Sequence, residues 1–278
     1  MSMQIACPIC KTNIGKSDSK LQTLENCSNC DFVIKQLHGV PILRTHKKDE
    51  VLDILEEAQS LPIQDSSTLK IPFVQEALES NKNVLQLGAG VDKCNLPHLI
   101  KTDAYLYSTD LHSLVDAHQM PFPDNTFDYV YSLAVFEHLH SPWIAANEIF
   151  RVLKPGGKVF ILTAFMQHMH GYPNHYFNMT TSGAKRIFSQ FDISKCEPSS
   201  WSNFDQLAYI LGDLNCLLDE LKISWNEKSS LKSLRNGISE IYKHLPKFNS
   251  KLLKCNTKSN GSWEKIAPAI ELEASKPL

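Results

Sequence analysis

Apolar, strand-length runs separated by turns and helical segments fill the middle of the chain, and this alternation constrains the fold more than any other feature. Residues 83–87, 104–110, 127–131 and 158–163 have the length and composition of buried strands. A helical pattern at 143–152 connects the last two. Strands and helices in this order predict an α/β protein with a parallel, doubly wound sheet.

The C-terminal part predicts the rest of that sheet. Residues 181–191 have a helical pattern that Thr181 or Ser182 would cap, and residues 193–196 follow as a sixth strand. Residues 267–274 alternate like a strand and would add an antiparallel seventh strand. Between them, residues 201–246 have dense apolar positions at helical spacing. We expect a helical insertion over 201–258 that acts as a lid or forms a homodimer face.

Four cysteines near the N-terminus form two C-x-x-C pairs. Each pair lets two thiolates from one tight turn bind the same ion, and the spacing between the pairs fits a zinc ribbon. The alternative is a redox pair, but a redox pair would open a helix, whereas proline, asparagine and glycine surround these cysteines. We expect structural Zn²⁺ at Cys7, Cys10, Cys27 and Cys30, and the ion would supply much of the folding energy of so small a segment.

Three regions follow from these patterns. A zinc ribbon occupies residues 1–46, and it ends in a predicted strand from residue 31 with a turn at 38–41. A helical connector occupies 47–80, with helices expected near 51–58 and 73–80. Residues 81–278 form the larger domain.

Composition and charge limit the classes of binding partner that we expect. The formal net charge of −2 gives no overall reason to expect nucleic acid or an anionic membrane surface. No secretory signal and no apolar stretch of about 20 residues occurs in the sequence, so we expect a cytoplasmic protein that does not insert into a membrane.

A glycine turn and two acids predict a nucleotide-type cofactor site. Gly88-Ala89-Gly90 follows the first strand, where backbone N–H groups can approach a ligand closely. Asp110 would end the second strand and accept hydrogen bonds from a ribose diol, and Asp116 would end the third and face an adenine amino group. NAD enzymes use the same ribose acid, but their fingerprint needs a third glycine where this chain has Lys93.

The joint pattern "VLQLGAG … TD … DAHQMPFPDNTFDYVYSLAVFEHLHSPWIAANEIFRVLKPGGKVFIL" resembles class I methyltransferases related to the ubiquinone and menaquinone biosynthesis enzymes. The resemblance covers about half of the chain. It implies a Rossmann-like, seven-stranded fold and S-adenosylmethionine (SAM) as the cofactor. It also implies cofactor contacts from Gln86, Gly88, Ala89, Gly90, Asp110, Leu111, Asp116, Ala117, Leu133 and His138.

Two positions depart from the pattern of that family. Gln86 stands where the family has an acid, and Asp92 stands where it has a third glycine. Gln86 cannot pair as an anion with the cofactor's ammonium group, and a carboxylate at Asp92 would repel a carboxylate ligand. The alternative to an enzyme is therefore a non-catalytic scaffold whose ribbon recruits a partner. The ribbon, with its final "HGVPIL", itself resembles the zinc-ribbon activator subunit of tRNA and protein methyltransferases.

The segment after the fifth strand predicts the acceptor side of the site. In open α/β sheets, ligands bind beyond the carboxyl ends of the strands, and residues 165–180 combine three histidines with tyrosines there. His175 and His170 are candidate catalytic bases for an oxygen acceptor, although each could equally serve to pack the loop. The pattern "GYPNHYFNMT" also resembles a loop of methyltransferases from glycan gene clusters. We therefore expect a small hydroxylated molecule or a glycan as the acceptor.

Overall fold

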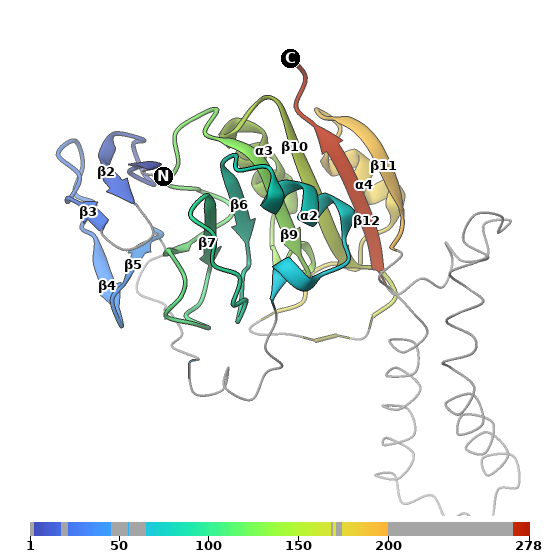
Figure 1. The fold of residues 1–278 in the computed structure, drawn as a ribbon, viewed down its shortest axis with the longest axis horizontal. Helices are drawn as coiled ribbons and strands as arrows, with labels where there is room; N and C mark the ends of the chain where they lie inside the picture. Colours follow the sequence, from blue (N-terminus) through green and yellow to red (C-terminus); the bar gives the residue numbers. More distant parts are fainter. Residues whose placement is uncertain are drawn as a thin grey trace, which may run out of the picture.

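The computed structural model describes residues 3–17, 22–45, 55, 65–167, 169–170, 174–199 and 269–278. These residues form a three-stranded sheet and a nine-stranded sheet with helices packed on both faces of the larger one (Figure 1). The predicted insertion at 201–258, with its lid or homodimer face, lies outside the described residues, as does most of the predicted helix near 51–58. Within the described residues, no helix is both long and apolar enough to cross a bilayer.

The nine-stranded sheet contains seven strands in a Rossmann-like order, as the sequence predicts, although the second of them lies at other residues than expected. Its order is β11-β12-β10-β9-β6-β7-β8-β5-β4, and β12 runs antiparallel to both of its neighbours. The strand β6 pairs in parallel with β7 on one side and with β9 on the other, so the direction of winding switches there. The seven strands are β6 (Val84–Leu87), β7 (Leu99–Asp103), β8 (Ser113–Val115), β9 (Phe127–Leu133), β10 (Leu153–Ala164), β11 (Asp192–Pro198) and β12 (Ala269–Ser275).

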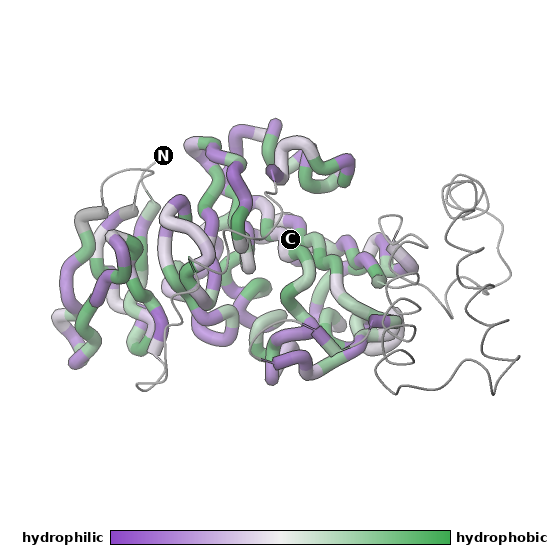
Figure 2. Tube along the Cα trace, turned by 90° about the horizontal axis from the view of Figure 1, so that it is seen from below, coloured by the Kyte–Doolittle hydropathy of each residue, from purple (hydrophilic) through white to green (hydrophobic). Residues whose placement is uncertain are grey.

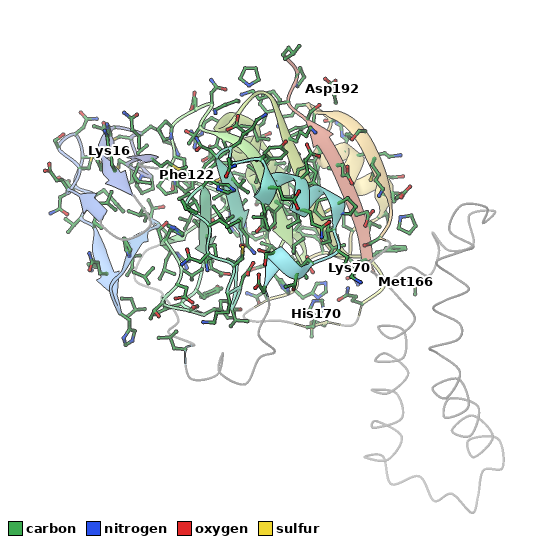
Figure 3. The ribbon with its side chains drawn as sticks, in the orientation of Figure 1. Lys16, Lys70, Phe122, Met166, His170 and Asp192 are labelled. Carbon is green, nitrogen blue, oxygen red and sulfur yellow. The ribbon has the colours of Figure 1, made fainter. Side chains whose placement is uncertain are left out.

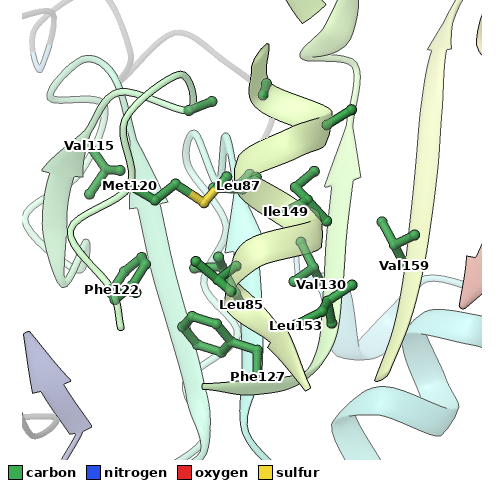
Figure 4. Close-up of a cluster of buried hydrophobic side chains, with 14 of the residues drawn as sticks. Leu85, Leu87, Val115, Met120, Phe122, Phe127, Val130, Ile149, Leu153 and Val159 are labelled. Atoms are coloured by element: carbon green, nitrogen blue, oxygen red, sulfur yellow. The ribbon is translucent and has the colours of Figure 1, made fainter. Parts of the chain in front are cut away.

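Alternate residues of the central strands pack against helices on opposite faces. Val84 and Phe160 lie in a core with helix α2 (Pro72–Glu79), which matches the second predicted connector helix. Leu85 and Ile161 lie in a second core with α3 (Pro142–Val152) and α4 (Thr181–Ile187). Figure 4 shows the side chains of this second core around α3. Hydropathy changes every few residues along the chain (Figure 2), as expected for strands with two buried faces beside polar turns.

The cysteine-containing head joins the large sheet. Strands β1 (Met3–Ala6), β2 (Asn13–Ser17) and β3 (Gln22–Leu24) form the small antiparallel sheet. Strands β4 (Lys35–Leu37) and β5 (Val40–Leu43) form a hairpin, and β5 pairs in parallel with β8. The head and the sheet therefore share hydrogen bonds as well as a core.

The turn of that hairpin is shorter than predicted. Only His38 and Gly39 form it, with φ of 48° and 83°, whereas Val40 and Pro41 already belong to β5. Two successive residues with positive φ are typical of a type I′ turn, whose twist matches that of the flanking strands. A two-residue turn fixes the pairing of β4 with β5.

One prediction about the glycine-turn region is wrong: the second strand is β7, not residues 104–110. Residues 88–98, between β6 and β7, form an irregular connection. Lys101 lies in the middle of β7 and is 1% exposed, with its Nζ donating to the backbone oxygen of Asp92 at 2.9 Å. A lysine in the middle of a buried strand interrupts the apolar run by which such a strand is recognised in a sequence. Pro97 and the buried side-chain bonds of Asp92 disfavour a helix in the connection.

The start of α4 is displaced by one residue from the prediction. Thr180, not Thr181 or Ser182, is the N-cap, and its hydroxyl accepts a hydrogen bond from the backbone N–H of Gly183 at 3.0 Å. The predicted sixth and seventh strands are confirmed as β11 and β12.

Candidate functional site

A cavity of about 360 Å³ lies where the central parallel strands end. The ends of β6, β7 and β8 form one side of it, and the segment after β9 forms the other. Its lining includes Arg44, Gly88, Gly90, Asp103, Tyr105, Tyr107, Asp116, Ala117, His118, Leu133, His138, Asn174 and Tyr176. This is the edge of an α/β sheet at which ligands bind.

The glycine turn forms one wall of the cavity. Gly88 and Gly90 have φ of +70° and +54°. A Cβ on Gly88 would lie 2.1 Å from Cγ2 of Val135, whereas a Cβ on Gly90 would meet nothing within 4 Å. Gly88 therefore permits the close approach of the two loops, and Gly90 leaves space for a ligand beside exposed backbone.

Asp103, the last residue of β7, lines the cavity. Its Oδ2 accepts from the backbone N–H of Gly90 at 2.9 Å, and its Oδ1 accepts from that of Tyr105 at 3.2 Å. Burial raises the pKa of Asp103 to about 6. Its carboxylate retains lone pairs that can accept from hydroxyl groups of a ligand.

Asp110, predicted as the ribose acid, does not line the cavity. Its side chain is 51% exposed and forms an ion pair with Lys93 at 3.0 Å. The reason is that β7 ends at Asp103, so Asp110 lies on the connection to β8. Leu111 is buried in a hydrophobic cluster and Ala89 packs in the same cluster, so neither side chain lines the cavity.

Gln86 and Asp92, the two departures from the family pattern, contact each other beneath the glycine turn. The Nε2 of Gln86 donates to Oδ2 of Asp92 at 2.7 Å, and both side chains are buried. The Oδ1 of Asp92 accepts from the backbone N–H groups of Ser66 and Cys94. The pair thus holds together the segments around the turn and does not line the cavity.

Asp116 and Ala117, two of the predicted cofactor contacts, line the cavity at the end of β8. The Oδ1 of Asp116 accepts from the backbone N–H and the Nδ1–H of His118, at 2.8 and 2.7 Å. The ring of His118 stacks on that of His140, with centroids 4.1 Å apart. The aspartate is therefore held in one orientation at the cavity wall.

Arg44, from the head, also lines the cavity. It follows β5, and its guanidinium donates to the backbone oxygen of Ala104 and lies over the ring of Tyr105, 5.6 Å from the centroid. Sequence patterns gave no signal for Arg44, because only the pairing of β5 with β8 brings it to this site.

Leu133, the last residue of β9, and His138, which follows that strand, also line the cavity; both are predicted cofactor contacts. The Nδ1–H of His138 donates to the backbone oxygen of Asn174 at 2.8 Å. With Nδ1 as the donor, Nε2 is the ring nitrogen that remains for another partner. Asn174 and Tyr176 bring the loop after β10 to the same side of the cavity.

His175 and His170, the two predicted bases, lie close together behind His138. Their ring centroids are 4.5 Å apart and lie 5.6 and 5.2 Å from that of His138. The Nδ1 of His175 accepts from the backbone N–H of His170 at 3.3 Å, and its Nε2–H donates to Asn178 at 3.0 Å. Both nitrogens of His175 are thus used within the loop, so the geometry assigns it to positioning the loop.

The four N-terminal cysteines come together as the spacing predicts. The Sγ atoms of Cys7 and Cys30 lie 3.6 Å apart, those of Cys10 and Cys27 lie 3.4 Å apart, and all four lie within 4.8 Å of one another. Sulfur ligands at about 2.3 Å from a tetrahedral Zn²⁺ would have similar separations. Hydrogen bonding to Thr12 lowers the pKa of Cys10 to about 5, whereas burial raises the pKa of Cys7.

Comparisons with known proteins agree with this fold. Residues 97–161 match the family model described as "Methyltransferase domain". Over 132 residues the chain is 30% identical to the ubiquinone/menaquinone biosynthesis C-methyltransferase UbiE of a Ruegeria species, covering 46% of this chain and 50% of that protein. It is 36% identical over 77 residues to the demethylmenaquinone methyltransferase of Bacillus licheniformis, covering 28% and 32%.

Among solved structures, the [4+2]-cyclase SpnF covers 71% of this chain and 75% of its own, with 17% identity and a TM-score of 0.43. The chain spans half or less of the length of the two methyltransferases named above. In the segment 97–161 and in the order of its sheet, the chain is therefore similar to methyltransferases. The family match includes β7, β8 and β9, whose ends form the cavity.

Proposed function

We propose that this chain transfers a methyl group from SAM to a hydroxyl oxygen of a small molecule or glycan. The observation that carries the proposal is the cavity in which the glycine turn, Asp103 and Asp116 face one another across the ends of β6, β7 and β8. This arrangement provides separate places for an amino acid, a ribose and an adenine.

The residues present fit SAM in a specific order. The open backbone at Gly90 accommodates the methionine part, and the carboxylate of Asp103 accepts from the ribose hydroxyls. Asp116 and Ala117 lie where they can contact the adenine, and Arg44 with Tyr105 closes the ribose side. Gln86 and Asp92 support the turn from below, so their departure from the family pattern leaves the cavity wall itself intact.

The acceptor enters from the side of His138, Asn174 and Tyr176. When bound, SAM supplies an electrophilic methyl group on its sulfonium sulfur. The acceptor oxygen forms a bond to the methyl carbon while the sulfur–carbon bond breaks, and the hydroxyl proton passes to solvent. The protein contributes alignment of the two reactants, which can supply much of the rate enhancement.

The four-cysteine cluster is best explained as a structural zinc site of a ribbon resembling methyltransferase activator subunits. The separations of its sulfur atoms suit a tetrahedral ion, and the described cysteines form no disulfide. Here the ribbon belongs to the same chain as the domain it would support.

Calorimetric titration of the zinc-loaded protein with SAM and S-adenosylhomocysteine tests the proposal. We expect binding of both ligands. Folded protein that binds neither would overturn the proposal and favour the alternative, a methyltransferase-like scaffold that recruits a partner through its ribbon.

A second acceptor class is favoured by the names of the relatives, which include a ubiquinone/menaquinone biosynthesis C-methyltransferase. A hydroxylated aromatic ring could present either its oxygen or its carbon to the methyl group. Mass spectrometry of products from a panel of sugars and quinol-like phenols separates the two. Transfer to ring carbon alone would refute the oxygen acceptor while leaving the SAM site standing.

A further inference from the structure

A buried carboxylate and two histidines lie together at the acceptor end of the cavity. One ligand atom from each of Glu137, His138 and His170 lies within 4.8 Å of the others. His138 lines the cavity, and His170 lies at the edge where the parallel strands end (Figure 3). Two imidazoles and one carboxylate are a ligand set typical of divalent transition metals.

Glu137 provides an independent indication of a cation. Its side chain is 1% exposed, and its Oε2 accepts from the hydroxyl of Thr163 at 2.9 Å. Its Oε1 is buried and has no hydrogen-bond partner among the described residues, and it lies 3.9 Å from Nε2 of His170. A buried carboxylate oxygen without a donor is costly, and a bound cation would remove that cost.

Hydrogen bonds to neighbouring residues orient His138 and the loop that carries His170. Nδ1 of His138 donates to the backbone oxygen of Asn174, which leaves Nε2 to bind the metal. A histidine that binds a metal through one ring nitrogen usually donates a hydrogen bond from the other in this way. The His175 ring accepts from the backbone N–H of His170 and is itself fixed by Asn178, whose amide donates to Gln167. The backbone oxygen of Glu137 accepts from the N–H groups of Tyr176 and Phe177, which joins the loop to the segment after β9.

We propose that Glu137, His138 and His170 form a binding site for a divalent transition-metal ion, distinct from the four-cysteine site. Three protein ligands leave coordination positions open, and His138 places the ion at the cavity wall. Those positions can take an oxygen of the acceptor. This last point rests on the proposed methyl transfer, whereas the metal site itself does not.

The test uses the full chain with its cysteine site loaded with zinc, and Co²⁺ as the probe. We expect one further equivalent of Co²⁺ to bind, with weak visible d–d absorption and no thiolate charge-transfer band in the near ultraviolet. Glu137→Gln and His170→Ala should each weaken this binding by more than about 100-fold, since even outer partners of a metal ligand contribute about 10- to 100-fold. His38→Asn, at an exposed histidine that does not line the cavity, is the matched control and should bind Co²⁺ as the wild type does.

Several outcomes would overturn the site. They are no second equivalent of Co²⁺ in folded wild type, a thiolate charge-transfer band from that equivalent, or unchanged binding in His170→Ala. The side chain of His170 is 28% exposed, so its substitution should not prevent folding if that of Glu137 does. SAM titration of the same samples separates the two proposals: SAM binding without Co²⁺ binding rejects only the metal site, and Co²⁺ binding without SAM binding rejects only the methyl transfer.

Discussion

Two aspartates seven positions apart have opposite environments, and this difference decides which of them can contact a ligand in the cavity. Asp103 is 8% exposed and lines the cavity, whereas Asp110 pairs with Lys93 at the surface. Both follow strand-like sequence. Because β7 ends at Asp103, this acid can face a ligand, whereas Asp110 lies beyond the strand and faces solvent.

Asp103→Asn should therefore weaken SAM binding by roughly 10- to 100-fold, because a hydrogen bond to a charged acceptor contributes about 1.5–3 kcal/mol. Asp110→Asn is the matched control and should change the affinity less than about twofold, since its ion pair is exposed. Calorimetry on both variants measures the difference. Equal effects, or a larger effect at Asp110, would show that the ribose site has been misplaced.

The raised pKa of Asp103 predicts a pH dependence of SAM binding. Its carboxylate is ionised above about pH 6 and protonated below it, because burial favours the neutral form. SAM affinity should be highest above that pH and fall by up to about tenfold per unit below it. Titrations at several pH values check this, with Asp103→Asn expected to lack the decrease. A flat wild-type profile down to about pH 5 would contradict it.

The hairpin β4–β5 connects the cysteine-containing head to the cofactor site. β5 extends the large sheet beside β8, and Arg44 follows it into the cavity. The backbone N–H of Ala6 donates to Pro121, and Lys11 donates to Met120, so the head also holds the segment after β8. Loss of order in the head should thus disturb the ribose side of the cavity.

If the four cysteines hold Zn²⁺ as proposed, a chelator that removes it should lower SAM affinity by about tenfold or more, because small metal-binding segments fold around the ion. Re-addition of Zn²⁺ should restore it. Arg44→Ala tests the local contact, because it should weaken SAM binding while the protein stays folded and metal-loaded. Lys16→Ala, on β2 of the head, is the comparison and should bind SAM normally. SAM affinity that is indifferent to zinc would rule out this coupling.

One hydrophobic core runs through both parts of the molecule. Ile5, Cys7 and Phe32 of the head belong to the same cluster as Met120 and Phe122 of the larger domain. Ile149 of α3 packs in the same cluster (Figure 4). A shared core and a shared sheet favour a single cooperative unit rather than two independent ones.

Unfolding in guanidinium should consequently occur in one transition for both parts. The Co²⁺-substituted ribbon reports on the head through thiolate absorption, and far-ultraviolet circular dichroism reports on the large sheet. The two midpoints should coincide within error. A ribbon that loses its absorption well before the sheet unfolds would show that the head is a separate folding unit.

Much of this architecture follows from local sequence. Strands β6, β9, β10, β11 and β12 are predictable because each has apolar residues on both faces or a clear alternation. The clustering of the four cysteines follows from their spacing, since each pair occupies one turn. Gly88 and Asp116 reach the cavity because they directly follow strands that the sequence identifies.

Tertiary structure decided what depends on contacts between distant segments. Lys101 can lie inside β7 only because the backbone of Asp92 accepts its ammonium group, so the position of Asp103 could not be read locally. Arg44 reaches the cavity through the pairing of β5 with β8, and Glu137 meets His170 only when the loop after β10 folds back. Hydrophobic periodicity encodes which residues are buried, whereas the identity of a buried polar residue's partner is fixed only once the sheet has formed.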